Sequence, residues 1–517
     1  MAENIFTEEK AMKKCILVLA VILIAGTVLG CKGNKQAERS SETPDVIVIA
    51  SQQDFAVLDP FNTTATPDMN ANWCIFDSLF NMDIHGNVYP LVAEKWEVSS
   101  TGLEITFHIR KGITFHDGSP LTAKDVVYSA QKMKESPFKR RVAVLFDRAE
   151  VIDDHTMKFI LPQPAASFMY ELAYNFAVYS EAATERLGDN FKNNPIGCGP
   201  YQIVSKEAGK GVTLKAYEKY YGGVAPIKNI EFKVIPDAST ALVSLENGEI
   251  DLCQYVPAAS YPLVIKNPKL ELLQTKYSRV FNLILNTKAA PFKDNVALRQ
   301  AIAHAIDKQF LVDVALEGYG SVAVTLVNET FIAYPSNISK HAREYNVDKA
   351  KQLMKEAGYA NGAGLPTLKI STIEMFKKQS EIIQAQLKEI GINVDIEMNE
   401  LSAYLAMQSG GTLQMGLMST NQGGDASVFA QLLLEGASNN GACYNNPEVA
   451  RLFTKASAEL DNTKRAAIFD DLYRIVLDDM PYVSIYFPDT ISCGRNDLDF
   501  AKIMDFVAYK GNLYSYK

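Results

Sequence analysis

Residues 368–398 constrain the fold more than any other stretch, because two hydrophobic periods alternate there within a short length. Leu368 to Ile373 predicts a strand, and Ile392 to Met398 predicts a second one, in which every second side chain is apolar. Between them, Lys378 to Ile390 places its apolar side chains on one stripe of a helix, and Gly391 follows that helix. A strand, a crossover helix and a strand in so few residues make a right-handed βαβ unit with parallel strands. The sequence therefore predicts an α/β lobe.

A second stretch, Tyr89 to Tyr128, predicts a hairpin followed by a helix. Leu103 to Ile109 alternates apolar and polar side chains, which is the pattern of a strand with one buried face. A turn with Gly102 separates this strand from a shorter one before it. Thr122 and Asp125 have the spacing of a capping box, and an apolar helical pattern begins there.

The same stretch resembles the signature of the extracytoplasmic solute-binding proteins of ABC transporters, family 5, the peptide- and nickel-binding group. Three pieces carry the resemblance: Pro90 to Trp96 (PLVAEKW), Phe107 to Gly112 (FHIRKG) and Phe115 to Val126 (FHDGSPLTAKDV). As a joint pattern they are highly specific, and we expect most of them to build the hairpin and the capped helix and not a ligand site.

The resemblance implies an α/β fold of two hinged lobes, the type II periplasmic-binding-protein fold in its large cluster, with an extra subdomain in lobe one. It also implies that the chain is not an enzyme and needs no cofactor. Its expected role is to close round a small solute, most simply a peptide, and to deliver it to the permease and ATPase subunits of an importer. A monomer is expected.

The resemblance covers nearly everything after about Asp45 and divides the chain into lobes. Residues 45–280 are expected to form lobe one, with an inserted subdomain at about 76–190. Residues 281–487 are expected to form lobe two, and residues 488–517 to return to lobe one. A second family-like motif, Asn194 to Tyr201 (NPIGCGPY), has Cys198 where relatives usually have threonine.

The N-terminus has the pattern of an export signal. Lys13 and Lys14 precede an apolar run that is short for a membrane span, and residues 1–30 read as a signal peptide. The run ends in VLGC, which resembles a lipobox with Cys31 as the acylated residue, and Met12 is an alternative start. Residues 31–44 would then be a polar tether, and the protein would be lipid-anchored on the outer side of the cell membrane. An uncut N-terminal anchor is the alternative.

Composition and motif searches exclude several function classes. A net charge of -9 argues against a nucleic-acid partner, which would need a basic face. Ser129 and Lys132 have SxxK spacing but no KTG partner, and the six histidines lack ligand spacing, so neither catalysis nor a metal is expected. Apart from Cys31, five cysteines follow the proposed signal, and one pair of them could form a disulfide, but the sequence does not show which pair: Cys74, Cys198, Cys253, Cys443 and Cys493.

Local patterns make further predictions whose bounds a structure can test. They predict a helix over Trp73 to Phe80, one strand over Asp153 to Leu161, and one long helix over Leu298 to Ala315. Strands are also expected at Gln414 to Met418 and at Pro481 to Phe487.

Candidate ligand contacts come from the resemblance. Thr64 and Thr66 fall where relatives contact ligand, and the strand of Gly416, Leu417 and Met418 would offer main-chain groups to an extended ligand. Two tyrosines could line the site, although a core role is at least as plausible for each: Tyr444 and Tyr486.

One departure from the family bears on the ligand. Peptide-binding relatives often carry tryptophan where Leu417 stands and, a few residues on, an aspartate that pairs with the peptide ammonium. Here that acidic position falls on Thr420 or Asn421, and the nearest carboxylate is Asp425. A neutral residue loses this charge-assisted pair. Peptide is therefore a hypothesis, and a sugar, an opine or a nickel chelate stays open, as does a sensor or chaperone-like role without a transporter. A hydrolase on the same scaffold is a third class.

Overall fold

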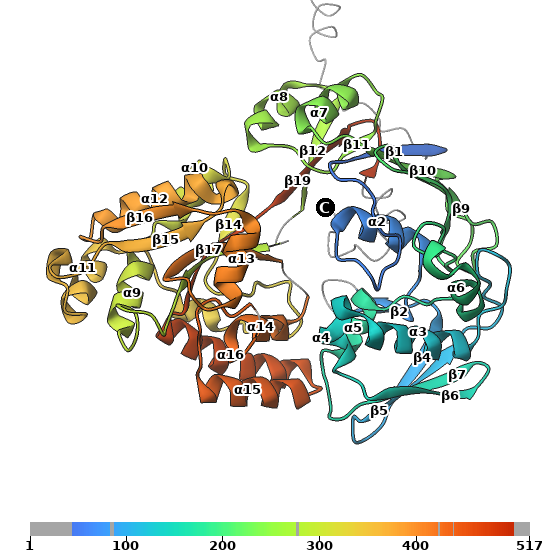
Figure 1. Ribbon diagram of the computed structural model, residues 1–517, viewed down its shortest axis with the longest axis horizontal. Helices are drawn as coiled ribbons and strands as arrows, with labels where there is room; N and C mark the ends of the chain where they lie inside the picture. The colour runs from blue at the N-terminus through green and yellow to red at the C-terminus, as the bar shows by residue number, and fades with distance from the viewer. Residues whose placement is uncertain (1–43, 83–86, 276–278, 422–423, 438, 501–517) are drawn as a thin grey trace, which may run out of the picture.

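The computed structural model describes residues 44–82, 87–275, 279–421, 424–437 and 439–500, which form two lobes, each built round its own sheet (Figure 1). The predicted signal peptide, nearly all of the tether and Cys31 lie outside these residues. Within the described part of the chain, no helix is long and apolar enough to cross a membrane.

Lobe one is organised by a seven-stranded sheet in the order β12-β19-β11-β1-β10-β9-β8. Its first strand, β1, runs parallel to β10 and β11, and its last, β19, runs antiparallel to β11 and β12. The strands are β1 (Val46–Ser51), β8 (Tyr201–Glu207), β9 (Gly211–Ala216), β10 (Asn229–Val234), β11 (Leu252–Cys253), β12 (Leu270–Thr275) and β19 (Thr490–Arg495). Two helices, α7 (Ala238–Glu246) and α8 (Tyr261–Lys266), pack on the part of the sheet formed by β12, β19 and β11, with a small separate core.

Residues between β1 and β8 add a four-stranded antiparallel sheet, in the order β4-β5-β7-β6, and a short hairpin, β2-β3. The strands are β2 (Phe80–Met82), β3 (Val88–Pro90), β4 (Ala93–Val98), β5 (Glu104–Ile109), β6 (Arg148–Asp153) and β7 (Thr156–Ile160). The helices are α2 (Thr66–Ile75), α3 (Ala123–Glu135), α4 (Arg140–Ala143), α5 (Phe168–Asn175) and α6 (Glu181–Leu187). The predicted capping box is confirmed, since the Thr122 N–H donates to Asp125 Oδ2 at 2.9 Å.

Lobe two is built on a six-stranded sheet in the order β14-β18-β13-β17-β15-β16. The strands are β13 (Arg279–Leu285), β14 (Gly320–Val322), β15 (Leu368–Thr372), β16 (Val394–Met398), β17 (Met415–Asn421) and β18 (Tyr482–Pro488). The helices are α9 (Val296–Ala305), α10 (Lys308–Ala315), α11 (Val347–Glu356), α12 (Lys377–Lys388), α13 (Leu401–Ser409), α14 (Ala430–Leu433), α15 (Pro447–Ala458) and α16 (Asn462–Asp479). β15 and β16 are parallel with α12 between them, which confirms the parallel βαβ prediction.

The chain passes between the two sheets twice. β12 lies in the sheet of lobe one and β13 in that of lobe two, and Asp489 alone separates β18 from β19 on the return. The bounds 45–280, 281–487 and 488–517 remain predictions; residue 280 lies in β13 and residue 488 in β18, so both inner bounds fall within strands of the lobe-two sheet. The end of the chain thus completes a sheet that its beginning started.

Three element predictions were wrong in their bounds. The helix expected over Trp73 to Phe80 is α2, which ends at Ile75, where the Ile75 carbonyl accepts a hydrogen bond from the Gly199 N–H at 2.9 Å. The strand expected over Asp153 to Leu161 is β7, which covers only Thr156–Ile160, because the Asp153 carboxylate accepts from the His155 N–H in the turn that joins β6 to β7.

The long helix expected over Leu298 to Ala315 is two helices, α9 and α10. Asp307 breaks the run, because its side chain accepts from the Phe310 N–H at 2.9 Å and caps a new helix. Apolar periodicity continues across the break, so the pattern alone could not show it.

His116 joins the two family-like motifs of lobe one. Its backbone N–H donates to the Gly197 carbonyl at 2.9 Å, its Nε2 lies 3.0 Å from the Gly199 carbonyl, and its Nδ1 accepts from the Gly197 N–H at 3.3 Å. Burial lowers the pKa of His116 to about 4, against the hydrogen bond to Gly199, which acts in the other direction. The neutral ring is therefore a structural link between the motifs.

Candidate functional site

β17 has one partly unpaired edge. On one side it pairs with β13 over its whole length, from Met415 opposite Leu285 to Asn421 opposite Arg279. On the other side β15 pairs only with Met415 and Gly416. Within the described residues, no strand pairs with residues 417–421 on that side. Because alternate residues of a strand direct their N–H and C=O groups to opposite sides, this edge can hydrogen-bond an extended ligand.

Two buried polar side chains lie on one face of this strand pair. Thr420 stands opposite Val280, and Met418 stands opposite Asn282, so all four side chains share a face. Thr420 is 7% exposed and Asn282 0%. Within the part of the chain that the structure describes, Thr420 Oγ1 and Asn282 Oδ1 have no hydrogen-bond partner. Buried polar atoms without partners are costly, so a ligand group or ordered water is expected here.

Gly416 allows a close approach on the same face. A Cβ atom at this position would lie 2.8 Å from the Tyr404 hydroxyl oxygen, which belongs to α13. Leu417, on the opposite face, is fully buried in the core of lobe two. The backbone of Asn421 ends β17, and its side chain is outside the described set.

Asp425 is engaged inside lobe two. Its Oδ2 and Oδ1 lie 2.5 and 2.7 Å from the two terminal nitrogens of Arg465, and both side chains are almost fully buried. Asp425 Oδ1 also accepts from the Ser427 N–H at 2.9 Å, which caps a short 3-10 helix, η7 (Ala426–Phe429). The predicted ligand contact by Asp425 stays a prediction, and in this arrangement the carboxylate charge is already compensated by a guanidinium.

The turn before Asp425 contacts lobe one. The Gly424 N–H donates to the Tyr170 hydroxyl of α5, and the Gly424 carbonyl accepts from the Ile332 N–H at 2.7 Å. A second contact between the lobes is the Ala166 N–H, which donates to the Ser457 carbonyl of α15 at 2.9 Å. The chain at the end of β17 is therefore held between its own lobe and α5 of the other.

A buried carboxylate of lobe one lies next to this contact. Glu171, 5% exposed, accepts from Arg141 Nη2 at 3.0 Å and from Asn175 Nδ2 at 2.8 Å. Burial raises the pKa of Glu171, and the negative charge of Asp425 raises it further, while Arg141 opposes both. Two carboxylates thus approach each other across the lobe contact, each held by its own arginine.

The threonines predicted in lobe one lie just before and at the start of α2. Thr64 and Thr66 are exposed, whereas Thr63 is buried and donates to Asp68 Oδ2 at 2.8 Å. Figure 1 shows α2 on the side of lobe one that faces lobe two. Their ligand contacts remain predictions.

The two predicted tyrosines lie in the core of lobe two. The Tyr444 hydroxyl donates to Asp479 Oδ2 at 2.5 Å. Tyr486 stacks on Phe281 with ring centroids 4.7 Å apart, and its hydroxyl accepts from Gln379 Nε2 at 3.1 Å. Each tyrosine is less than 5% exposed, which favours the core role over ligand contact.

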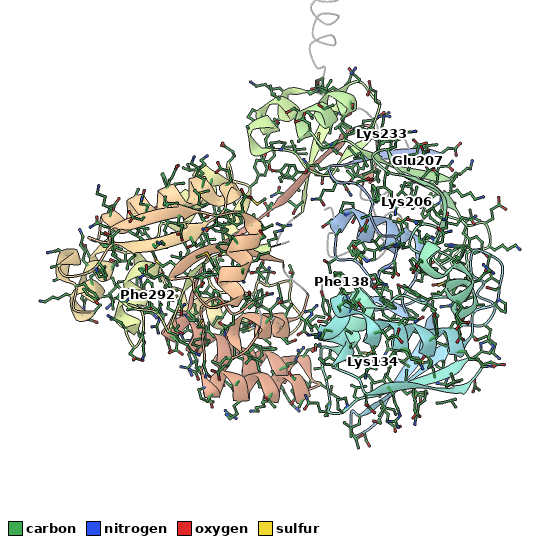
Figure 2. All side chains as sticks on the ribbon, viewed as in Figure 1. Lys134, Phe138, Lys206, Glu207, Lys233 and Phe292 are labelled. Carbon is green, nitrogen blue, oxygen red and sulfur yellow. The ribbon has the colours of Figure 1, made fainter. Side chains whose placement is uncertain are left out.

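Sequence reasoning missed Tyr170, Asn282 and Arg465. Tyr170 and Arg465 sit in helices, where nothing in the pattern distinguishes them from other helical residues. A polar residue inside the apolar strand FNLILN was the available signal for Asn282. Phe138 is an exposed aromatic side chain of lobe one, with 52% of its surface accessible. Figure 2 shows it beside α4 and α5, on the edge toward lobe two.

Comparisons with known proteins agree with this architecture. The family model of bacterial extracellular solute-binding proteins, family 5 Middle, matches residues 87–441. The chain is 29% identical over 435 residues to the heme-binding protein A of Haemophilus influenzae, covering 77% of this chain and 79% of that protein. It is 28% identical over 433 residues to the dipeptide-binding protein of Escherichia coli, covering 77% and 80%.

A solved structure shares the fold over most of the chain. It is the periplasmic binding protein DppA of Helicobacter pylori in complex with the peptide STSA, with a TM-score of 0.74 and 27% identity. The likeness covers 91% of this chain and 98% of that one.

Proposed function

This chain belongs to the bacterial extracellular solute-binding proteins of family 5, and from that premise we propose that it captures a peptide between its lobes. It is a substrate-binding protein of an ABC transporter and not an enzyme. The peptide, the delivery to permease and ATPase subunits, the lipid anchor and the monomeric state are parts of the proposal.

The unpaired edge of β17 is the observation that carries the peptide. Residues 417–421 keep main-chain groups that β15 does not use, and an extended peptide is the ligand whose own groups repeat at the same spacing. The proposed contacts on this side are Gly416, Leu417 and Met418 through the backbone, with Thr64 and Thr66 from lobe one.

The peptide N-terminus is proposed to meet a hydroxyl and not a carboxylate. Thr420 Oγ1 is buried and has no partner among the described residues, whereas Asp425 is already paired with Arg465. A neutral acceptor gives up the stronger charge-assisted bond to an ammonium. We therefore expect this protein to depend on the peptide backbone more than on its N-terminal charge.

A second candidate ligand class is a tetrapyrrole. The identity to the heme-binding relative, 29%, is no lower than the 28% to the dipeptide-binding one. Identity alone does not choose between these ligands, so both belong in the first screen, together with a sugar, an opine and a nickel chelate.

Ligand-induced thermal stabilisation tests the proposal. A ligand that binds only the folded protein raises its Tm. We expect shifts with short peptides that change little when the peptide N-terminus is acetylated. A shift with hemin or another class and none with any peptide would overturn the peptide proposal and leave the family assignment in place.

Two substitutions sharpen this test. Thr420→Asp places a carboxylate at one of the two positions, Thr420 or Asn421, on which the family's acidic residue falls, and is expected to favour free over acetylated peptides by roughly tenfold, as one charge-assisted bond allows. Thr420→Val keeps the shape without the hydroxyl and serves as the matched control, with no gain for free peptides. Equal affinity for the two peptides in Thr420→Asp would place Thr420 away from the ligand N-terminus.

The lipid anchor has its own test. We propose acylation of Cys31 after removal of residues 1–30, on the strength of the VLGC sequence. Cells fed a labelled fatty acid are expected to label the protein, and Cys31→Ala is expected to abolish the label. Persistent labelling in Cys31→Ala would point to another acylated residue.

A further inference from the structure

Two cysteines face each other across neighbouring strands of lobe one. In the antiparallel pair of β11 and β19, Cys253 stands directly opposite Cys493. Side chains that are directly opposite in a sheet lie on the same face. Both belong to the small core under α7 and α8, and their exposed fractions are 2% and 0%.

The register places this pair within disulfide range. The Arg495 N–H donates to the Asp251 carbonyl at 3.2 Å, two residues along each strand, so Cys253 and Cys493 also occupy a hydrogen-bonded position. Such pairs have Cα atoms about 5.5 Å apart, and disulfides accept about 4.4–6.8 Å. Cβ atoms of directly opposite residues are about 4.5–5.5 Å apart, and those of a disulfide about 3.5–4.5 Å, so bond formation requires the two strands to shift locally toward each other.

We propose that Cys253 and Cys493 form a disulfide when this extracellular protein folds in an oxidising compartment. In the reaction each thiol loses one proton and one electron, and the S–S bond forms between the two sulfur atoms. The electrons and protons pass to a low-molecular-weight or protein disulfide, RS–SR, which leaves as two RSH. The inference does not depend on the identity of the ligand.

The position of the bond gives it a structural role. Residues 254–492 would lie inside the covalent loop, and they contain all of β13 to β18, the complete sheet of lobe two. β19 begins one residue after Asp489, which follows β18. The disulfide would therefore fix the returning strand in the sheet of lobe one independently of whether lobe two is folded.

Burial restricts when the bond can form. Burial raises the pKa of the Cys493 thiol to about 12 and raises the pKa of Cys253, so little thiolate is present in the folded, reduced protein. The Cys253 thiol also donates to the Tyr255 carbonyl at 3.0 Å. We therefore expect the two thiols to be oxidised during folding, before α7 and α8 cover β19. Oxidation of the folded, reduced protein is expected to be slow.

Peptide mapping of the full-length protein tests the pairing. The protein is refolded with oxidised and reduced glutathione, its remaining thiols are alkylated in denaturant, and it is digested with trypsin. The two cysteines fall in residues 234–266 and 475–495, and we expect these fragments to be linked. Quantitative alkylation of both residues, or linkage of either to a different cysteine such as Cys74 or Cys198, would overturn the proposal.

Thermal unfolding tests the role of the bond. A cross-link round so long a loop is expected to raise the Tm of the oxidised protein by about 5 °C or more. Reductant should remove this gain in the wild type and in Cys443→Ala, the matched control in lobe two. It should have no such effect in Cys253→Ala or in Cys493→Ala. A linked pair whose reduction leaves the Tm unchanged would overturn the stabilising role.

Discussion

The family-like motifs and the strand of the proposed site lie in different lobes. In lobe one the family-like motifs pack on each other, and His116 of the first bonds to Gly197 and Gly199 of the second. In lobe two the strand that carries the proposed site, β17, holds the predicted departures from the peptide-binding pattern, at Leu417 and at Thr420 or Asn421. The signature therefore builds the scaffold, while the residues proposed to contact a ligand lie outside it.

One buried polar group in each lobe shows a second difference. His116 of lobe one is a neutral imidazole between backbone groups, whereas Asp425 and Arg465 of lobe two form an ion pair with both side chains almost fully buried. The contribution of a neutral ring to stability depends on pH, whereas the contribution of a buried ion pair is lost when either partner is removed. Three changes separate these behaviours, from the largest expected effect to the smallest.

Removing one partner of the ion pair is expected to have the largest effect. Arg465→Met leaves Asp425 buried without its cation, and such losses cost about 3–5 kcal/mol. Arg465 Nε also donates to the Ala456 carbonyl at 3.0 Å, which adds to the loss. Urea unfolding should show the decrease in the free energy of unfolding.

The control for this change is Arg451→Met, which removes an exposed pair with Glu448 and is expected to leave the free energy of unfolding almost unchanged, because solvent screens exposed pairs. Asp425→Asn combined with Arg465→Met should recover part of the stability. If Asp425→Asn alone kept full stability but lost binding of peptides with a free N-terminus, Asp425 would be a ligand contact after all.

Acid is expected to weaken lobe one through His116, with an intermediate effect. Its pKa is lowered from 6.5 to about 4 in the folded protein, so the unfolded chain binds more protons between these values. Stability is therefore highest above pH 6.5 and falls as the pH drops to about 4. A full shift corresponds to about 3 kcal/mol, and partial exposure of the ring reduces the expected loss to about 2 kcal/mol.

An NMR titration of the His116 ring checks the shift directly, with a midpoint expected well below 6.5. In His116→Gln the slope of stability against pH between these values should become shallower. A midpoint near 6.5 would mean that protonation leaves the bonds to Gly197 and Gly199 intact, contrary to this account.

The contact between the lobes is expected to have the smallest effect. Tyr170→Phe removes the acceptor for the Gly424 N–H, and one such hydrogen bond contributes about 1 kcal/mol. If the observed arrangement of the lobes is the one that binds, the ligand Kd should rise about fivefold, which calorimetry can measure. Tyr345→Phe, at a side chain that is 46% exposed in lobe two, is the control and should leave Kd unchanged.

Local patterns predicted much of the fold correctly. The hairpin of β4 and β5, the capping box of Thr122 and Asp125, and the parallel βαβ unit all depend on residues close in sequence. The errors have causes of two kinds. Asp307 restarts a helix within an unbroken apolar period, which is a local effect, whereas the end of α2 meets Gly199, far along the chain.

The candidate site could be predicted only in part. The sequence predicted a strand at Gln414 to Met418, which the structure confirms as β17, while the neutral position at Thr420 or Asn421 stays a prediction. It could not show that β15 stops pairing after Gly416, or that Tyr444 and Tyr486 turn into the core. Strand pairing and side-chain burial depend on neighbours that the local pattern does not contain.

The sequence by itself determined the class of fold and many of its elements, since hydrophobic period and capping act over a few residues, and its motifs indicated the family. The tertiary structure decided which charges and thiols meet. Asp425 and Arg465 lie 40 positions apart, Tyr170 and Gly424 lie 254 apart, and Cys253 meets Cys493 only because the chain returns from lobe two. Such contacts are set by the packing of whole elements, and that packing decides which polar groups remain for a ligand.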